Sequence, residues 1–85
     1  MYAITFVNSF GTQISLEVRS GSKPCDQNTV RYDGVLDGGG AYTLNTDDSV
    51  VCYLRTADPT NPAGGLTGWN TFSPDDINTP ATITL

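Results

Sequence analysis

Hydrophobic and polar residues alternate along much of the chain, most clearly over residues 12–20. Ile14, Leu16 and Val18 are separated there by polar residues, so an extended strand places all three on one face. Residues 2–9 show the same period of two. The short link between the two segments contains a glycine, as tight turns often do. The sequence therefore predicts that these two strands pair as a β-hairpin.

Five more segments have the composition of strands and are bounded by turn-forming residues, chiefly glycine, proline, aspartate and serine. They cover residues 29–36, 41–46, 50–56, 68–73 and 79–85. The third of these is apolar on both faces, which is typical of a central strand covered on both sides or of a strand facing a partner. In the last of them, Ile83 and Leu85 are expected to point inward.

The composition supports an all-β fold. Threonine alone supplies 12 of the 85 residues, and no stretch shows an amphipathic helical pattern free of glycine and proline. Seven short strands with turns between them predict a small two-layer antiparallel β-sandwich of Ig-like or jelly-roll-like type. A small β-barrel is the alternative. We expect residues 1–85 to form a single domain, because half of so short a chain could not bury a core.

Cys25 and Cys52 are the only cysteines, and the chain has no histidine. Two thiolates alone cannot complete a tetrahedral zinc site, so the pair predicts either a disulfide or two buried free thiols. A disulfide would stabilise the fold by about 3 to 4 kcal/mol in the chain-entropy model. We favour the disulfide, since a domain of this size buries little surface and gains much from a staple.

The chain is acidic, with a formal net charge of −5. Its basic residues are spread along the sequence, whereas nucleic acids and anionic membranes are bound by clustered Lys and Arg. We therefore expect no nucleic-acid partner. No apolar run is long enough to cross a bilayer, which predicts no membrane insertion. The first residues also lack the basic and apolar regions of a signal peptide.

The residue types that most enzyme mechanisms need are missing. Without histidine, the chain cannot form a Ser-His-Asp or Cys-His arrangement. The lone Lys23 lies in a loop rather than in the buried setting that a Ser-Lys mechanism needs. The Asp pairs at 47–48 and 75–76 are typical of turns rather than of a glycosidase. The sequence thus predicts no enzyme, no catalytic residue and no cofactor.

Calcium is an open but unfavoured alternative. Several aspartates could gather at one end of a sandwich, although their spacing does not match an EF-hand loop. These are Asp37, Asp47, Asp48, Asp75 and Asp76. We assign no metal ligand from the sequence.

The segment 57–72 is the strongest candidate for a binding surface. It contains prolines that stiffen it and the only tryptophan of the chain. Trp, Tyr and Arg are the residue types that dominate binding hot spots. The contact candidates in and beside this segment are Tyr53, Arg55, Asp58, Leu66, Trp69 and Phe72. Trp69 either packs in the core, where it would cover the cysteine pair, or stands out as a contact anchor.

Two functions fit these observations. The first is a non-enzymatic structural or assembly protein that acts through protein–protein contacts, such as a virion-surface protein of capsid decoration or coat type, or a subunit of an extracellular lattice or filament. The second is a monomeric secreted binding module, an inhibitor of a protease or glycosidase or a carbohydrate binder, that uses residues 57–72. We expect the first, with self-association or a larger assembly outside the cell or on a virion. It reconciles a cysteine pair with the missing signal peptide.

Overall fold

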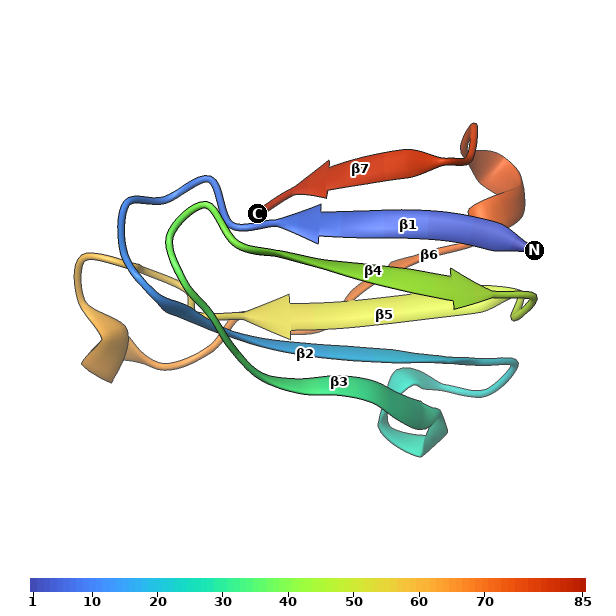
Figure 1. Cartoon of the computed structure of the whole chain (residues 1–85). Helices are drawn as coiled ribbons and strands as arrows, with labels where there is room; N and C mark the ends of the chain where they lie inside the picture. Colours follow the sequence, from blue (N-terminus) through green and yellow to red (C-terminus); the bar gives the residue numbers. More distant parts are fainter.

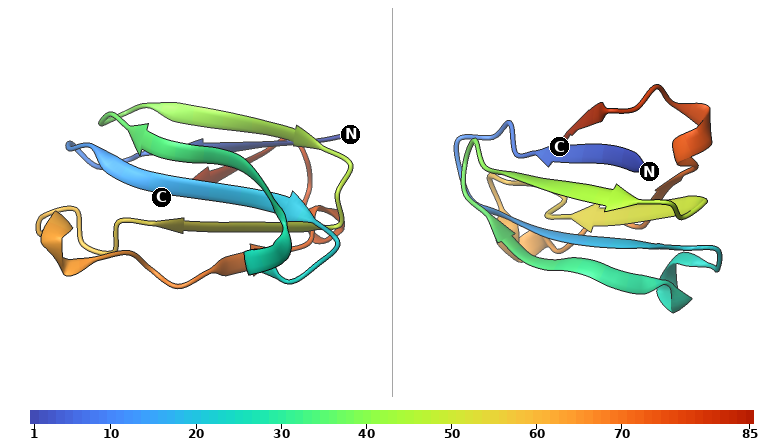
Figure 2. Two further views of the ribbon diagram at one scale, coloured as in Figure 1. Left: turned by 90° about the horizontal axis from the view of Figure 1, so that it is seen from below. Right: turned by 45° about the vertical axis from the view of Figure 1, so that its right-hand side comes forward.

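The computed structural model describes all 85 residues and shows an all-β protein of two packed sheets (Figures 1 and 2). The strands are β1 (Tyr2–Val7), β2 (Ile14–Gly21), β3 (Thr29–Leu36), β4 (Ala41–Thr46), β5 (Val50–Arg55), β6 (Asn70–Phe72) and β7 (Ala81–Thr84). Short 3-10 turns lie in the connections, namely η1 (Cys25–Gln27), η2 (Pro62–Gly64) and η3 (Pro74–Asp76). No helix is long and apolar enough to span a membrane. The predicted β-sandwich is confirmed.

The strands are divided between a three-stranded sheet, in the order β4-β1-β7, and a four-stranded sheet, in the order β3-β2-β5-β6. Neighbouring strands run antiparallel except β1 and β7, which are parallel. β1 and β2 belong to different sheets, so the predicted hairpin between them is wrong. The link crosses between the sheets because the side-chain amide of buried Asn8 donates to the backbone oxygens of Thr12, Leu36 and Asp37.

The inward side chains of the alternating segments form the core between the sheets. Ile14, Leu16 and Val18 of β2 lie on one side of it, and Ile4 and Phe6 of β1 lie on the other. None of these side chains is more than 1% exposed. Full burial of an aliphatic or aromatic side chain stabilises a fold by about 1.5 to 3 kcal/mol, so this contact between the sheets is the main source of stability.

β5 and β7, the parallel neighbour of β1, bury the side chains that the sequence indicates. β5 is an interior strand of its sheet, with Val51 fully buried in the core and Cys52 buried on the opposite face. Next to β1, Ile83 packs against the core and Leu85 is 6% exposed. Both inward positions predicted for the final segment are therefore confirmed.

The sandwich is closed on one side and open on the other. On the closed side, β3 and β4 are bridged by side chains: the Tyr42 hydroxyl donates to the Arg31 carbonyl, and the Arg31 guanidinium donates to the Asn45 carbonyl. The rings of Tyr32 and Tyr42 also lie 4.7 Å apart there. On the other side, β6 and β7 are the outermost strands of separate sheets, and no hydrogen bond joins them.

Cys25 and Cys52 form a disulfide, as favoured from the sequence. The bond lies on the outer face of the four-stranded sheet, because Cys52 alternates with the inward-facing Val51. It ties the η1 turn down onto that face. The Thr71 hydroxyl of β6 lies 3.1 Å from Cys25 Sγ, so the bond also sits against the neighbouring strand.

Replacing both cysteines, with Cys25→Ser and Cys52→Ala, is expected to lower the free energy of unfolding by about 3.5 kcal/mol. The cross-link joins residues 27 apart in sequence and so restricts a large part of the unfolded chain. Urea denaturation of the double variant and the wild type measures the difference. The β-sheet circular dichroism should survive, because the core lies on the other face. A loss below about 1 kcal/mol would contradict a stapling role.

Candidate functional site

The contact candidates on β5 and β6 lie on two faces of the four-stranded sheet. Tyr53 pairs with Asn70, and side chains at every second position share a face, so Tyr53, Arg55 and Phe72 point toward the space between the sheets. Trp69 alternates with them and points to the outer face. The six candidates therefore do not form one continuous surface.

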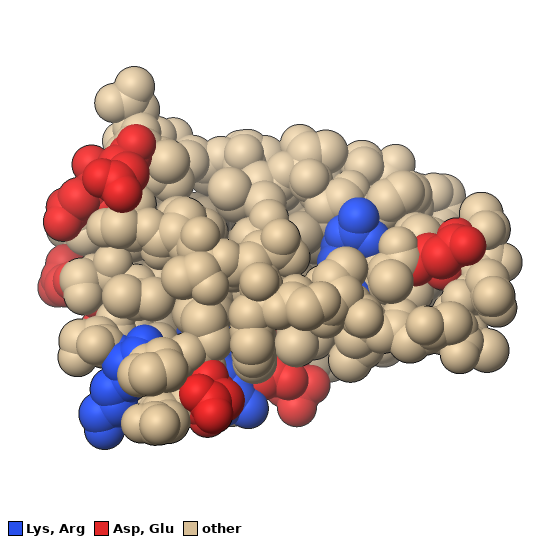
Figure 3. Space-filling view, turned by 180° about the vertical axis from the view of Figure 1, so that it is seen from behind, with Lys and Arg blue, Asp and Glu red and all other residues tan.

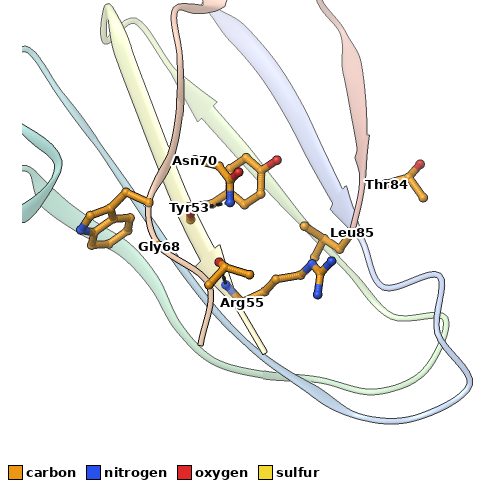
Figure 4. Close-up of a pocket in the computed structure, with 8 residues that line it drawn as sticks. Tyr53, Arg55, Gly68, Asn70, Thr84 and Leu85 are labelled. Atoms are coloured by element: carbon orange, nitrogen blue, oxygen red, sulfur yellow. Dashed lines mark hydrogen bonds between the residues drawn. The ribbon is translucent and has the colours of Figure 1, made fainter. Parts of the chain in front are cut away.

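A cleft of about 300 Å³ lies between the sheets on their open side (Figure 4). Its walls come from Tyr53 and Arg55 on β5, from residues 67–70, which include Trp69, and from Thr84 and Leu85 at the end of β7. Figure 4 shows the Arg55 side chain extending from β5 toward Leu85. This volume is at the lower end of the range for ligand sites, and it suits one or two side chains of a docked strand.

Basic side chains are scattered over the rear face of the molecule and form no patch there (Figure 3). Two of them are paired with carboxylates. Arg19 Nε lies 2.5 Å from Glu17, and Arg31 Nη1 lies 3.6 Å from Asp48. Arg55 forms no ion pair, although the protein is strongly acidic overall.

Arg55 is half-buried and well positioned inside the cleft. Its Nη1 donates to the backbone oxygens of Thr56 and Ala57, and its guanidinium carbon lies 5.2 Å from the centre of the Phe10 ring. These contacts hold the side chain but leave Nε and Nη2 free to donate. A guanidinium fork suits two-point binding of a carboxylate, so the cleft offers a preformed site for a negatively charged group.

Trp69 lies outside the core, so the core position considered from the sequence is not the one it adopts. The indole is half-buried on the outer face, with the guanidinium carbon of Arg19 5.4 Å from its ring centre. Trp69 also contributes to the lining of the cleft, just before the start of β6. Thr71, rather than Trp69, contacts both sulfur atoms of the disulfide.

The loop between β5 and β6 is braced at its base and carries the last two candidates. Thr56 and Leu66 pair there as an isolated β-bridge. The hydroxyl and the amide of Thr60 both donate to Asp58, and these bonds hold the pKa of the Asp58 carboxyl below its usual value. Leu66 is 55% exposed, so the loop presents an apolar side chain to solvent.

A second hollow, of about 180 Å³ and without any hydrophobic residue in its lining, was not expected from the sequence. At its edge the buried Ser20 hydroxyl donates to Asp48 Oδ2 over 2.7 Å and accepts from Arg31 Nη1 over 3.1 Å. The bond from Ser20, with Thr46 and Arg31 adding to it, holds the pKa of Asp48 below its usual value. The cluster joins β2, β3 and the β4–β5 turn, which only the sheet register brings together.

The five aspartates considered as calcium ligands do not gather at one end. They lie in three places, the β3–β4 turn, the β4–β5 turn and η3, and the first of these is at the opposite end of the sandwich from the other two (Figure 1). No three acidic or cysteine side chains are placed to share a metal ion.

No protein-family model matches the chain, and no curated protein or solved structure is significantly similar to it. Its function is therefore argued from its own surfaces, of which the cleft and the neighbouring strand β7 are the most distinctive.

Trp69→Ala is expected to lower the free energy of unfolding by about 1 kcal/mol, the size of a surface cation–π contact. The indole covers the outer face and leaves no core cavity when it is removed. Phe6→Ala is the matched core substitution and should cost about 3 to 5 kcal/mol. Urea denaturation of both variants tests this difference. Equal losses would show that Trp69 belongs to the core.

Stability is expected to fall as the pH drops through the lowered pKa of Asp48. The Ser20 bond exists only in the folded protein, so the folded pKa lies below the ordinary value of 3.8. The hydrogen-bonded Asp48 carboxylate therefore contributes fully to the free energy of unfolding above pH 3.8, and this contribution is lost as the pH falls through the folded pKa. The midpoint of thermal unfolding, measured as a function of pH, should fall less steeply at acid pH in Asp48→Asn than in the wild type. Asp26→Asn is the control and should show the wild-type dependence. An unchanged acid limb in Asp48→Asn would contradict the assignment.

Proposed function

We propose that this protein is a non-enzymatic structural subunit that works through protein–protein contacts within a larger assembly. Suitable assemblies are a virion surface, with the protein as capsid decoration or coat, and an extracellular lattice or filament. The observation that carries the proposal is the free edge of β7. It borders the cleft and, within Ala81–Thr84, lacks the charges, prolines and bulges that usually prevent edge strands from pairing.

The other three edge strands are protected. β3 carries the charged residues Arg31 and Asp33, and the register shift in its pairing with β2 leaves Arg31 unpaired as a bulge. β4 is covered by its side-chain bridges to β3. β6 is only three residues long. Within Ala81–Thr84, by contrast, β7 has no charge, no proline and no bulge. Such an edge is suited to accepting another strand.

The disulfide gives further support to work outside the cell or on a virion, because disulfides persist in oxidising surroundings and are rare in the cytosol. Stapling the outer face also lets the sandwich tolerate an open side. The protein can therefore keep a pairing edge exposed without relying on a partner to fold.

A second candidate function is that of a monomeric secreted binding module that uses the loop 57–72. The exposed Leu66 on a braced loop favours an inhibitor of a protease or glycosidase, since a rigid segment loses little entropy on binding. The arrangement is less suited to a carbohydrate binder. By the register of β5 and β6, Tyr53 and Trp69 face opposite sides of the sheet and cannot stack on one sugar ring.

Sedimentation velocity tests the assembly role. The average sedimentation coefficient of the purified protein should rise between about 10 μM and about 1 mM, as expected for an edge contact of micromolar to millimolar strength. In native material, the protein should sediment with large particles. Leu66→Ser is the control and should leave both results unchanged. A monomer at every concentration that is also free of particles in native material would contradict the proposal.

A further inference from the structure

The free edge of β7 presents two residues with unpaired backbone groups. The N–H of Leu85 donates to the carbonyl of Val7 in β1. Successive residues of a strand direct their backbone groups to opposite sides, so the amides and carbonyls of Thr82 and Thr84 point away from β1. An added strand can bind both residues without disturbing any bond to β1.

The β7 strand of a second copy fits this edge in an antiparallel register centred on Ile83. Thr82 of each copy then lies opposite Thr84 of the other, so the free groups of both strands are satisfied. Ile83 lies beside Ile83 of the second copy, on the face that borders the core and the cleft. A shift by one residue is excluded, because it places an inward side chain opposite an outward one.

The same pairing brings opposite charges together. It places the start of the second β7 strand beside the end of the first, where Arg55 lines the cleft. The η3 turn precedes β7 and lies at the other end of the strand from the cleft residues (Figure 1). It contains Asp76, which is exposed and whose carboxylate has no hydrogen bond or ion pair within the chain. Antiparallel pairing therefore brings the turn that carries this carboxylate to the end of the strand where the unpaired guanidinium of the other copy lies.

We propose that the partner at this site is a second copy of the chain. Two β7 edges pair antiparallel and join the three-stranded sheets into one sheet of six strands, and Arg55 of each copy binds Asp76 of the other. The inference rests on the proposed function, because it specifies one contact of the assembly. The contact is isologous and closes at two copies, which leaves the loop 57–68 and the outer sheet face free for other contacts.

A charge-swap experiment tests the pairing. Arg55→Glu and Asp76→Lys should each raise the dimer dissociation constant at least about tenfold, because each homodimer then brings like charges together twice. An equimolar mixture of the two variants should recover a dimer within about threefold of the wild-type constant, since the heterodimer restores opposite charges at both contacts. Sedimentation equilibrium measures these constants. The matched controls are Lys23→Glu and Asp26→Lys, which make the same charge changes away from β7 and should not alter dimerisation.

A second variant tests the strand pairing without any change of charge. Thr82→Pro removes an N–H that points to the free edge, and edge strands tolerate proline at such positions. The variant should remain folded by circular dichroism and lose dimerisation. Thr82→Val keeps the amide and should dimerise like the wild type.

The outcomes separate this inference from the proposed function. If the wild type self-associates but neither Thr82→Pro nor the charge swap affects it, the β7 pairing is overturned and the assembly role stands on another surface. If the purified wild type stays monomeric but is bound to particles in native material, the proposal that β7 pairs with a second copy is wrong. The proposed role in an assembly is then still supported. Loss of dimerisation in Thr82→Pro together with recovery in the mixture supports the pairing.

Discussion

Burial of one face of each sheet against the other holds this protein together, and this burial is complete on only one side of the sandwich. The turn at residues 37–40 joins the sheets on the closed side, where β3 and β4 are also bridged by side chains. On the other side, β6 and β7 are short edge strands of separate sheets, and no hydrogen bond joins them. The cleft, the unpaired Arg55 and the free edge of β7 all follow from this asymmetry.

The disulfide stabilises the fold although one side of the sandwich is open. It lies on the outer face of the four-stranded sheet, away from both the core and the cleft, so its contribution does not depend on the open side. A small domain buries little surface on folding, and one that leaves a side of its core open gains all the more from such a staple. The stabilising bond thus lies on the four-stranded sheet, whereas the free edge of β7 belongs to the three-stranded sheet. A partner strand can join or leave at β7 without disturbing the bond that stabilises the fold.

The strands could be predicted from the sequence because alternation is a local property, and the inward positions of β2 and β7 follow directly from it. The placement of β1 and β2 in different sheets could not be predicted. The glycine in their link indicates a turn, but the buried Asn8 side chain binds backbone oxygens of β3 and its following turn and so sends the chain to the other sheet. The direction of Trp69 depends on the register of β6, and the contact between Ser20 and Asp48 depends on the positions of β2 and β5. Neither register can be predicted from the residues of the strands themselves, because it depends on which strands become neighbours.

The proposed dimer depends on pairing between the free edge of β7 and the same edge of a second copy. Amide hydrogen exchange, followed residue by residue with NMR at increasing protein concentration, tests it most directly. The amides of Thr82 and Thr84 should become more protected as the concentration rises, while the amide of Leu85, already bonded to β1, stays protected throughout. Exchange of Thr82 and Thr84 at the same rate at every concentration would contradict it.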